Sequence, residues 1–238
     1  MNLTLTPSEM RRFAHQISLT EIGLEGQEIL KQSEVTICGL DGIGVTVMRC
    51  LLATGVGRVR IIDSGFITED WLPEQTLFGV GDVGKMRSIA AREKKFGGVN
   101  DQSINLYSTK FHKNNTDVLM GKSKILVETL HRSMLSSEMM DYADEQNIDV
   151  FSAFCMVKKG AFGLYSDNRK KEFREMINNI NFKISNDYYG LPFCFSSVSS
   201  FIGGIMACNV IKLLLGMYHK DSELYEIETI NFSLNKLL

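Results

Sequence analysis

The sequence has few of the features that mark specialised classes of protein. Its 238 residues include three prolines, one tryptophan and five cysteines, and no two cysteines have the C-x-x-C spacing. These cysteines argue against a disulfide scaffold and a zinc ribbon, and they favour a reducing cytoplasmic compartment (cytoplasm and nucleus in a eukaryote). No apolar run reaches the roughly 18 residues of a membrane span, and the first residues lack the apolar centre of a secretory signal. We therefore predict no zinc and no membrane partner.

An excess of charge of either sign is also lacking. The formal net charge is −2 and the isoelectric point is near 6.1, which argues against a broad nucleic-acid-binding surface. Hydrophobic residues make up 44% of the chain, a proportion typical of globular proteins. No repeat or linker is visible, so we expect a single domain.

The clearest pattern that is present alternates strands with helices. A glycine turn separates the first predicted strand from the first predicted helix, and the second strand ends at Asp63. The predicted strands are 35–38, 58–63, 124–128, 148–154, 160–165 and 224–232, and the predicted helices are 45–54, 84–95, 136–147 and 202–215. This order predicts an α/β fold of the Rossmann-like, doubly wound type, with a mostly parallel sheet.

The glycine turn has two interpretations. Gly39, Gly42 and Gly44 could let the backbone approach a nucleotide phosphate, and Asp63 could accept hydrogen bonds from ribose hydroxyls. Alternatively, the glycines only allow close packing between the strand and the helix. Asp41 stands inside the glycine cluster, where a carboxylate would oppose bound phosphates.

An ordered set of short motifs runs along nearly the whole chain. RFAHQI and EIGLEGQ precede the first strand, and TGVG, DVG and IGG follow the glycine turn in that order. In order and spacing these motifs resemble the ThiF/MoeB and ubiquitin-activating-enzyme superfamily. The resemblance implies one ThiF-type adenylation domain over 1–238, with an N-terminal helical arm (1–34), a nucleotide-fold core (35–165) and a C-terminal interface half (166–238).

The resemblance also implies an activity, the adenylation of the C-terminal glycine of a ubiquitin-like protein with ATP and magnesium. Position by position, the family's arginine finger falls on His15, and the asparagine and arginine of its S-N-L-x-R-Q segment fall on Trp71 and Glu74. The family's lysine falls on Arg87, and its magnesium-binding aspartate falls on His131. The middle glycine of its phosphate turn falls on Asp41. Asp63 and the other three glycines of the turn are retained. The lost cationic and metal-binding groups argue against ATP and magnesium, because such groups neutralise developing charge. Arg11 or Arg12 could replace the finger.

This pattern of loss resembles the non-catalytic small subunit of heterodimeric SUMO-type activating enzymes. Our first hypothesis is a degenerate subunit that pairs with a catalytically complete homologue and serves a ubiquitin-like protein. The alternative is an active, homodimeric ThiF/MoeB-type adenylyltransferase that acts on a sulfur-carrier or ubiquitin-like protein. A third class, a dinucleotide-binding oxidoreductase, depends on the glycine turn alone.

Three further features allow two interpretations each. Trp71 could plug the vacated pocket or anchor a partner. The apolar helix containing Gly203 and Gly204 could form an interface or belong to the core. Cys155 could be a thioester nucleophile, although a buried structural cysteine is the more common case.

Overall fold

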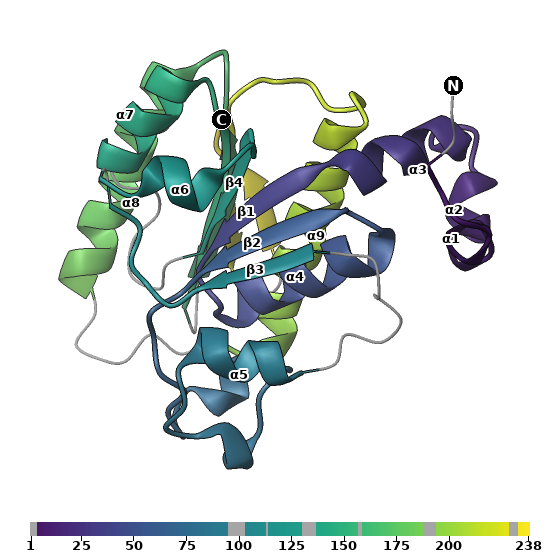
Figure 1. Cartoon of the computed structure of the whole chain (residues 1–238). Coiled ribbons are helices and arrows are strands. Elements are labelled where there is room, and N and C mark those ends of the chain that lie inside the picture. The colour runs from purple at the N-terminus through teal and green to yellow at the C-terminus, as the bar shows by residue number, and fades with distance from the viewer. Residues whose placement is uncertain are drawn as a thin grey trace.

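The computed structural model describes residues 4–94, 103–112, 114–129, 137–156, 159–187, 194–228 and 233–238. At its centre is an eight-stranded sheet with the order β3-β2-β1-β4-β5-β6-β7-β8 (Figure 1). The strands are β1 (Glu34–Cys38), β2 (Arg58–Ile62), β3 (Ser103–Tyr107), β4 (Ile125–Glu128), β5 (Asp149–Cys155), β6 (Lys159–Tyr165), β7 (Glu223–Glu228) and β8 (Ser233–Lys236). The first five strands are parallel, and β6, β7 and β8 continue the sheet in antiparallel pairs.

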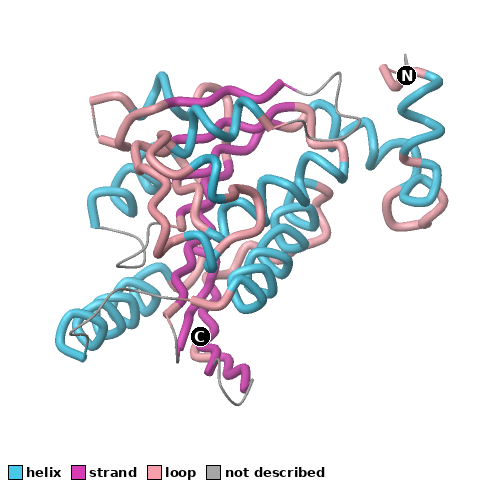
Figure 2. The backbone as a smooth tube through the Cα atoms, turned by 90° about the horizontal axis from the view of Figure 1, so that it is seen from below, coloured by secondary structure: helices cyan, strands magenta, loops and turns pink. Residues whose placement is uncertain are grey.

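Helices cover both faces of the sheet (Figure 2). One core layer contains α4 (Gly42–Thr54) and α9 (Ser196–Leu214), and the other contains α6 (Thr116–Met120), α7 (Ser137–Gln146) and α8 (Lys170–Asp187). Alternating side chains of β1 serve the two layers, since Val35 and Ile37 pack with α4 while Cys38 packs with the other layer. The fold class predicted from the sequence is therefore confirmed.

Residues 4–32 form a helical arm of α1 (Pro7–Arg12), α2 (Ala14–Ile17) and α3 (Gly23–Gln32), as Figure 1 shows. The side-chain amides of Gln16 and Gln27 both donate to the carbonyl of Thr54, at 3.1 and 3.0 Å. Phe13 packs against Gly55, where an added Cβ would lie 2.8 Å from the ring. The arm is thus attached at the C-terminal end of α4, opposite the glycine turn.

The segment between β2 and β3 departs from the sequence prediction. It contains two short 3-10 turns, η1 (Leu72–Glu74) and η2 (Val80–Asp82), and a helix, α5 (Arg87–Glu93), that is shorter than predicted. Gly84 has a φ of +87° and Met86 is extended, so the helix begins only at Arg87. At the C-terminus, the predicted strand 224–232 is confirmed as far as Glu228 in β7, and its last four residues lie outside the described part of the chain.

Helix α9 combines the length and apolar composition of a membrane-crossing helix, alone among the described helices. In the fold it packs along α4, and an added Cβ at Gly203 would lie 2.7 Å from Thr46 Cβ. A core helix has the same composition, so composition is only a weak indication of a membrane span. At Gly203 the packing favours the core interpretation, whereas an added Cβ at Gly204 would meet nothing within 4 Å.

Candidate functional site

The candidate site lies at the carboxyl ends of the central parallel strands. Strand β1 pairs with β2 on one side and with β4 on the other, which makes this edge a topological switch point. Ligands of open α/β sheets bind in the crevice at such a point. The loops that meet here follow β1, β2 and β4, and they carry Asp41, Asp63 and Thr129.

Close packing accounts for the three glycines of the turn. Gly39 has a φ of +112°, and an added Cβ would lie 2.5 Å from Thr129 Oγ1. An added Cβ at Gly44 would lie 2.0 Å from the Gly39 carbonyl oxygen, and one at Gly42 would lie 2.0 Å from the Glu74 carbonyl oxygen. The turn therefore requires glycine even without a ligand, and its role in nucleotide binding stays a prediction.

Asp41 has a structural role as the N-cap of α4. Its Oδ1 accepts a hydrogen bond of 2.7 Å from the backbone N–H of Gly44, and the residue is buried. The carboxylate satisfies an N–H that has no partner within the helix, and it complements the positive end of the helix dipole. One of the donors that a bound phosphate would use is therefore already engaged.

Asp63 connects two of the loops. Its Oδ2 accepts 2.7 Å from the Leu40 N–H, and its Oδ1 accepts 2.6 Å from the Gly65 N–H. Arg87 Nη1 lies 3.6 Å from Asp63 Oδ2, so the acid at the end of β2 and the cation at the start of α5 are neighbours.

Arg87 is itself placed by Trp71. The guanidinium carbon lies 4.1 Å from the centre of the indole ring, a cation–π contact, and Arg87 Nε is buried without a hydrogen-bond partner among the described residues. The indole is only 6% exposed and also packs against Phe78. Its burial favours the plug interpretation over a partner anchor.

Glu74 is the most perturbed acid of the site. Burial, and next the negative charge of Asp41, raise the pKa of Glu74 to about 7, while the nearby backbone N–H of Cys194 and the positive charge of Arg87 act in the opposite direction. The carbonyl oxygen of Glu74 accepts 2.7 Å from the hydroxyl of Ser199. Sequence analysis missed Cys194 and Ser199, because they follow Glu74 by more than a hundred residues and belong to none of the motifs.

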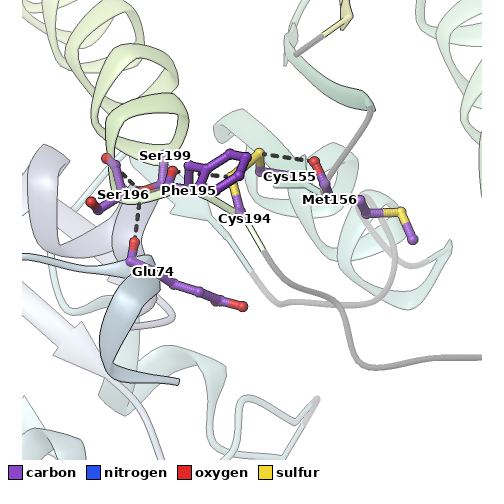
Figure 3. Close-up of a disulfide and its surroundings, with 7 residues drawn as sticks. All are labelled: Glu74, Cys155, Met156, Cys194, Phe195, Ser196 and Ser199. Atoms are coloured by element: carbon purple, nitrogen blue, oxygen red, sulfur yellow. Dashed lines mark hydrogen bonds between the residues drawn. A yellow bond between two sulfur atoms is a disulfide. The ribbon is translucent and has the colours of Figure 1, made fainter. Parts of the chain in front are cut away.

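A disulfide between Cys155 and Cys194 lies beside this cluster (Figure 3). Sequence analysis argued against a disulfide scaffold and did not predict this single bridge, which forms because the fold brings the end of β5 to the residues before α9. Cys155 is therefore not a free nucleophile in this form. The free thiols of the described residues are Cys38, Cys50 and Cys208, and burial raises the pKa of Cys38 well above its usual value.

One of the two histidines of the predicted site is not brought to it. His15 lies on α2, exposed and at the far end of α4, so within one chain it does not reach the cluster. His131 lies outside the described residues. No group of three or more metal-ligating side chains occurs within the described ranges.

The comparison with known families decides the identity of this scaffold. The model of the ThiF family matches residues 13–237. The chain belongs to the ThiF family. A probable molybdopterin-synthase adenylyltransferase of Porphyra purpurea is 25% identical over 99% of this ThiF chain and 63% of the relative. A sulfur carrier protein adenylyltransferase of Thermus thermophilus is 36% identical over 37% of the chain and 33% of the relative.

Solved structures agree on the fold of this ThiF-family chain. SeMet PaaA superposes with a TM-score of 0.78 at 21% identity, over 99% of this chain and 84% of PaaA. E. coli MccB with ATP superposes with a TM-score of 0.70 at 19% identity, over 99% and 72%. The chain spans less than two thirds of the curated relatives named above. The resemblance to ThiF and MoeB is confirmed, whereas that to a SUMO-type small subunit stays a prediction.

The residues of the site suit the two ends of ATP unequally. At the nucleoside end, Asp63 offers a fixed carboxylate for ribose hydroxyls, and Arg87 supplies a cation. At the phosphate end, Asp41 engages Gly44 N–H, and the Glu74 carbonyl lies against Gly42. The phosphate end is therefore the less suited of the two to an anion.

Proposed function

We propose that this chain is an ATP-dependent adenylyltransferase of the ThiF/MoeB kind, which activates the C-terminal carboxylate of a sulfur-carrier or ubiquitin-like protein. The observation that carries the proposal is the pairing of Asp63 with Arg87 at the switch point, 3.6 Å apart. The named adenylyltransferase relatives support the same reading. These relatives weigh against our first hypothesis of a non-catalytic subunit.

The proposal requires a way to reduce the negative charge around the phosphates. Protonation of Glu74 supplies it, since a pKa of about 7 leaves a large neutral fraction near neutral pH. Arg87 then keeps Asp63 as its ion-pair partner, and Asp41 stays engaged as the cap of α4. Nucleotide affinity should accordingly rise as the pH falls from about 8 to about 6.

Calorimetry with MgATP on wild type, Arg87→Gln and Arg92→Gln tests this proposal. Arg92 is the matched control, because it is an exposed arginine on the same helix, α5. We expect Arg87→Gln to lose at least about tenfold in affinity, as removal of a charged hydrogen-bonding partner does, and Arg92→Gln to bind like wild type. Pyrophosphate exchange with a sulfur-carrier protein ending in glycine then tests the reaction. Equal binding by the two variants would refute the role of Arg87.

A second candidate is the non-catalytic partner subunit, which one observation favours. The first turn of α4 is closed by the chain's own groups, since Asp41 caps it and the Glu74 carbonyl packs on Gly42. This candidate predicts no MgATP binding at any pH between about 6 and 8, together with a stable heterodimer with a family member that has the complete ATP motif. Light scattering of the mixed proteins distinguishes the two candidates.

A further inference from the structure

A cavity opens beside the C-terminal half of α9, away from the switch point. Its volume is about 410 Å³, and its walls come from α9 and the residues after it and from strands β6, β7 and β8. Cavities of roughly 300–1,000 Å³ commonly hold small molecules in proteins. The candidate site borders the other end of α9, where Ser199 donates to the Glu74 carbonyl, so the cavity is a separate place in the fold.

Three aromatic rings line this cavity. Phe162 of β6 and Tyr225 of β7 are stacked, with ring centres 5.2 Å apart and ring planes inclined by 14°. Tyr218, just after α9, contributes the third ring. Ile205 of α9 and the exposed Leu234 of β8 complete the apolar lining. Such walls favour a ligand with a flat apolar body, because aromatic rings stabilise one another in offset-stacked or edge-to-face contacts.

The acidic group of the cavity is already compensated. Glu223 of β7 accepts hydrogen bonds from the hydroxyls of Tyr218 and Tyr225, at 2.8 and 3.1 Å, and its other carboxylate oxygen lies 2.9 Å from Lys236 Nζ. Burial acts to raise the pKa of Glu223, but the hydrogen bonds from Lys236 and the two tyrosines outweigh it and lower the pKa. Glu223 is therefore ionised and paired at neutral pH, and it does not require a cationic ligand.

Two basic side chains of the lining have no such partner. Lys212 of α9 and His219 both border the cavity and are exposed. Within the described ranges, neither side chain has an acidic group or a hydrogen-bonding group as its partner. Since Lys236 neutralises Glu223, the uncompensated charge that borders the cavity is the positive charge of Lys212. Asn209 adds an amide that can donate to a carboxylate.

We propose that this cavity binds a small aromatic carboxylate, with its ring against the aromatic wall and its carboxylate toward Lys212 and His219. The three rings select the flat apolar body, and the basic side chains select the negative charge. The proposal is independent of the proposed function, because none of these residues belongs to the cluster around Asp63 and Arg87.

An NMR titration with naphthalene-2-carboxylate tests the proposal on protein that carries 13C-labelled isoleucine and leucine methyl groups. The ring of the probe should shift the methyl signals of Ile205 and Leu234, which Ile205→Val and Leu234→Val identify. Ile177 is the reference, because it is buried in the layer on the other face of the sheet, and its signal should not move. A probe of this size should bind with a Kd of about 1 mM or below.

The role of charge is tested with the neutral analogue naphthalene-2-carboxamide and two variants. We expect the amide to bind about fivefold more weakly than the carboxylate, and Lys212→Gln to weaken binding of the carboxylate alone by a similar factor of about five, the upper range for an exposed ion pair. Lys171→Gln is the matched control, since Lys171 is an exposed lysine on α8, and this variant should bind like wild type.

Two results would overturn the proposal. One is that the Ile205 and Leu234 methyl signals stay in place at probe concentrations up to about 5 mM, well above the expected Kd. The other is that the carboxylate and the amide bind equally well, or that Lys212→Gln binds the carboxylate like Lys171→Gln.

Discussion

Replacement of Glu74 by glutamine should stabilise the protein at neutral and alkaline pH. The side chain is 4% exposed, and burial with the nearby Asp41 raises the pKa of Glu74 to about 7. In the unfolded chain this carboxyl ionises at the ordinary glutamate value, near about 4.3. The folded state therefore holds a proton that the unfolded state releases, and stability falls as the pH rises from about 4.3 to about 7. Above that range the penalty is constant.

The size of the penalty follows from the two pKa values. Each pKa unit of difference corresponds to about 1.4 kcal/mol, so Glu74 lowers the free energy of unfolding by about 4 kcal/mol at pH 8. Glutamine has nearly the same shape and carries no charge. Glu74→Gln should recover most of this energy near pH 8 and little of it near pH 5.

Urea unfolding of wild type and Glu74→Gln at several pH values between about 5 and 8 measures this difference. Glu69→Gln is the matched control, because Glu69 is exposed and lies in the same loop. We expect the Glu74→Gln and wild-type curves to diverge as the pH rises, while Glu69→Gln runs parallel to wild type. Parallel curves for Glu74→Gln would show that Glu74 is ionised in the folded protein, and the reasoning about its charge would fail.

Other substitutions test the packing around the site. Gly203→Ala should lower the free energy of unfolding by about 1–3 kcal/mol, because its Cβ would lie 2.7 Å from a side-chain carbon of α4. Gly204→Ala should instead raise it by up to about 1 kcal/mol, since an added Cβ there meets nothing within 4 Å and alanine favours the helix. Thermal melts of the two variants measure the difference. Trp71→Ala should cost about 3–5 kcal/mol in urea unfolding, since a buried indole is removed. Asp41→Asn should preserve the cap of α4 and lower the titration midpoint of Glu74, as NMR would show, because the second-largest cause of its shift is gone.

The sequence predicted well those elements whose signals are local. The elements between Glu34 and Ile62 are a strand, a glycine turn, a helix and a second strand. Each is marked by the spacing of its own apolar residues or by glycines within a few residues of it, so local sequence is enough to predict it. Strand β3 (Ser103–Tyr107) and helix α8 (Lys170–Asp187) were missed, since the first is short and the second is largely polar. Helix α5 was predicted too long because periodicity alone does not show that Gly84 adopts a positive φ.

The candidate site was predictable only in part, for a different reason. Asp63 and Arg87 were found because they belong to motifs of fixed spacing, and the structure places them together. The contacts of Glu74 with Cys194 and Ser199 join segments more than a hundred residues apart, so no local pattern reports them. The disulfide was missed on the same grounds, since spacing does not show which loops the sheet order brings together.

The departures of this chain from its family's motifs are coupled, and their chemical effect differs from that of independent losses. Asp41 replaces a glycine and caps α4, and its charge in turn raises the pKa of Glu74, which stands at the position of an arginine. Two separate carboxylates would leave two negative charges near the phosphates. Two coupled, buried carboxylates favour one charge over two near neutral pH, because the second ionisation is opposed by the first. The site therefore carries less negative charge than its sequence indicates, and it opposes the binding of an anion less. The protonated fraction of Glu74 sets the size of this reduction.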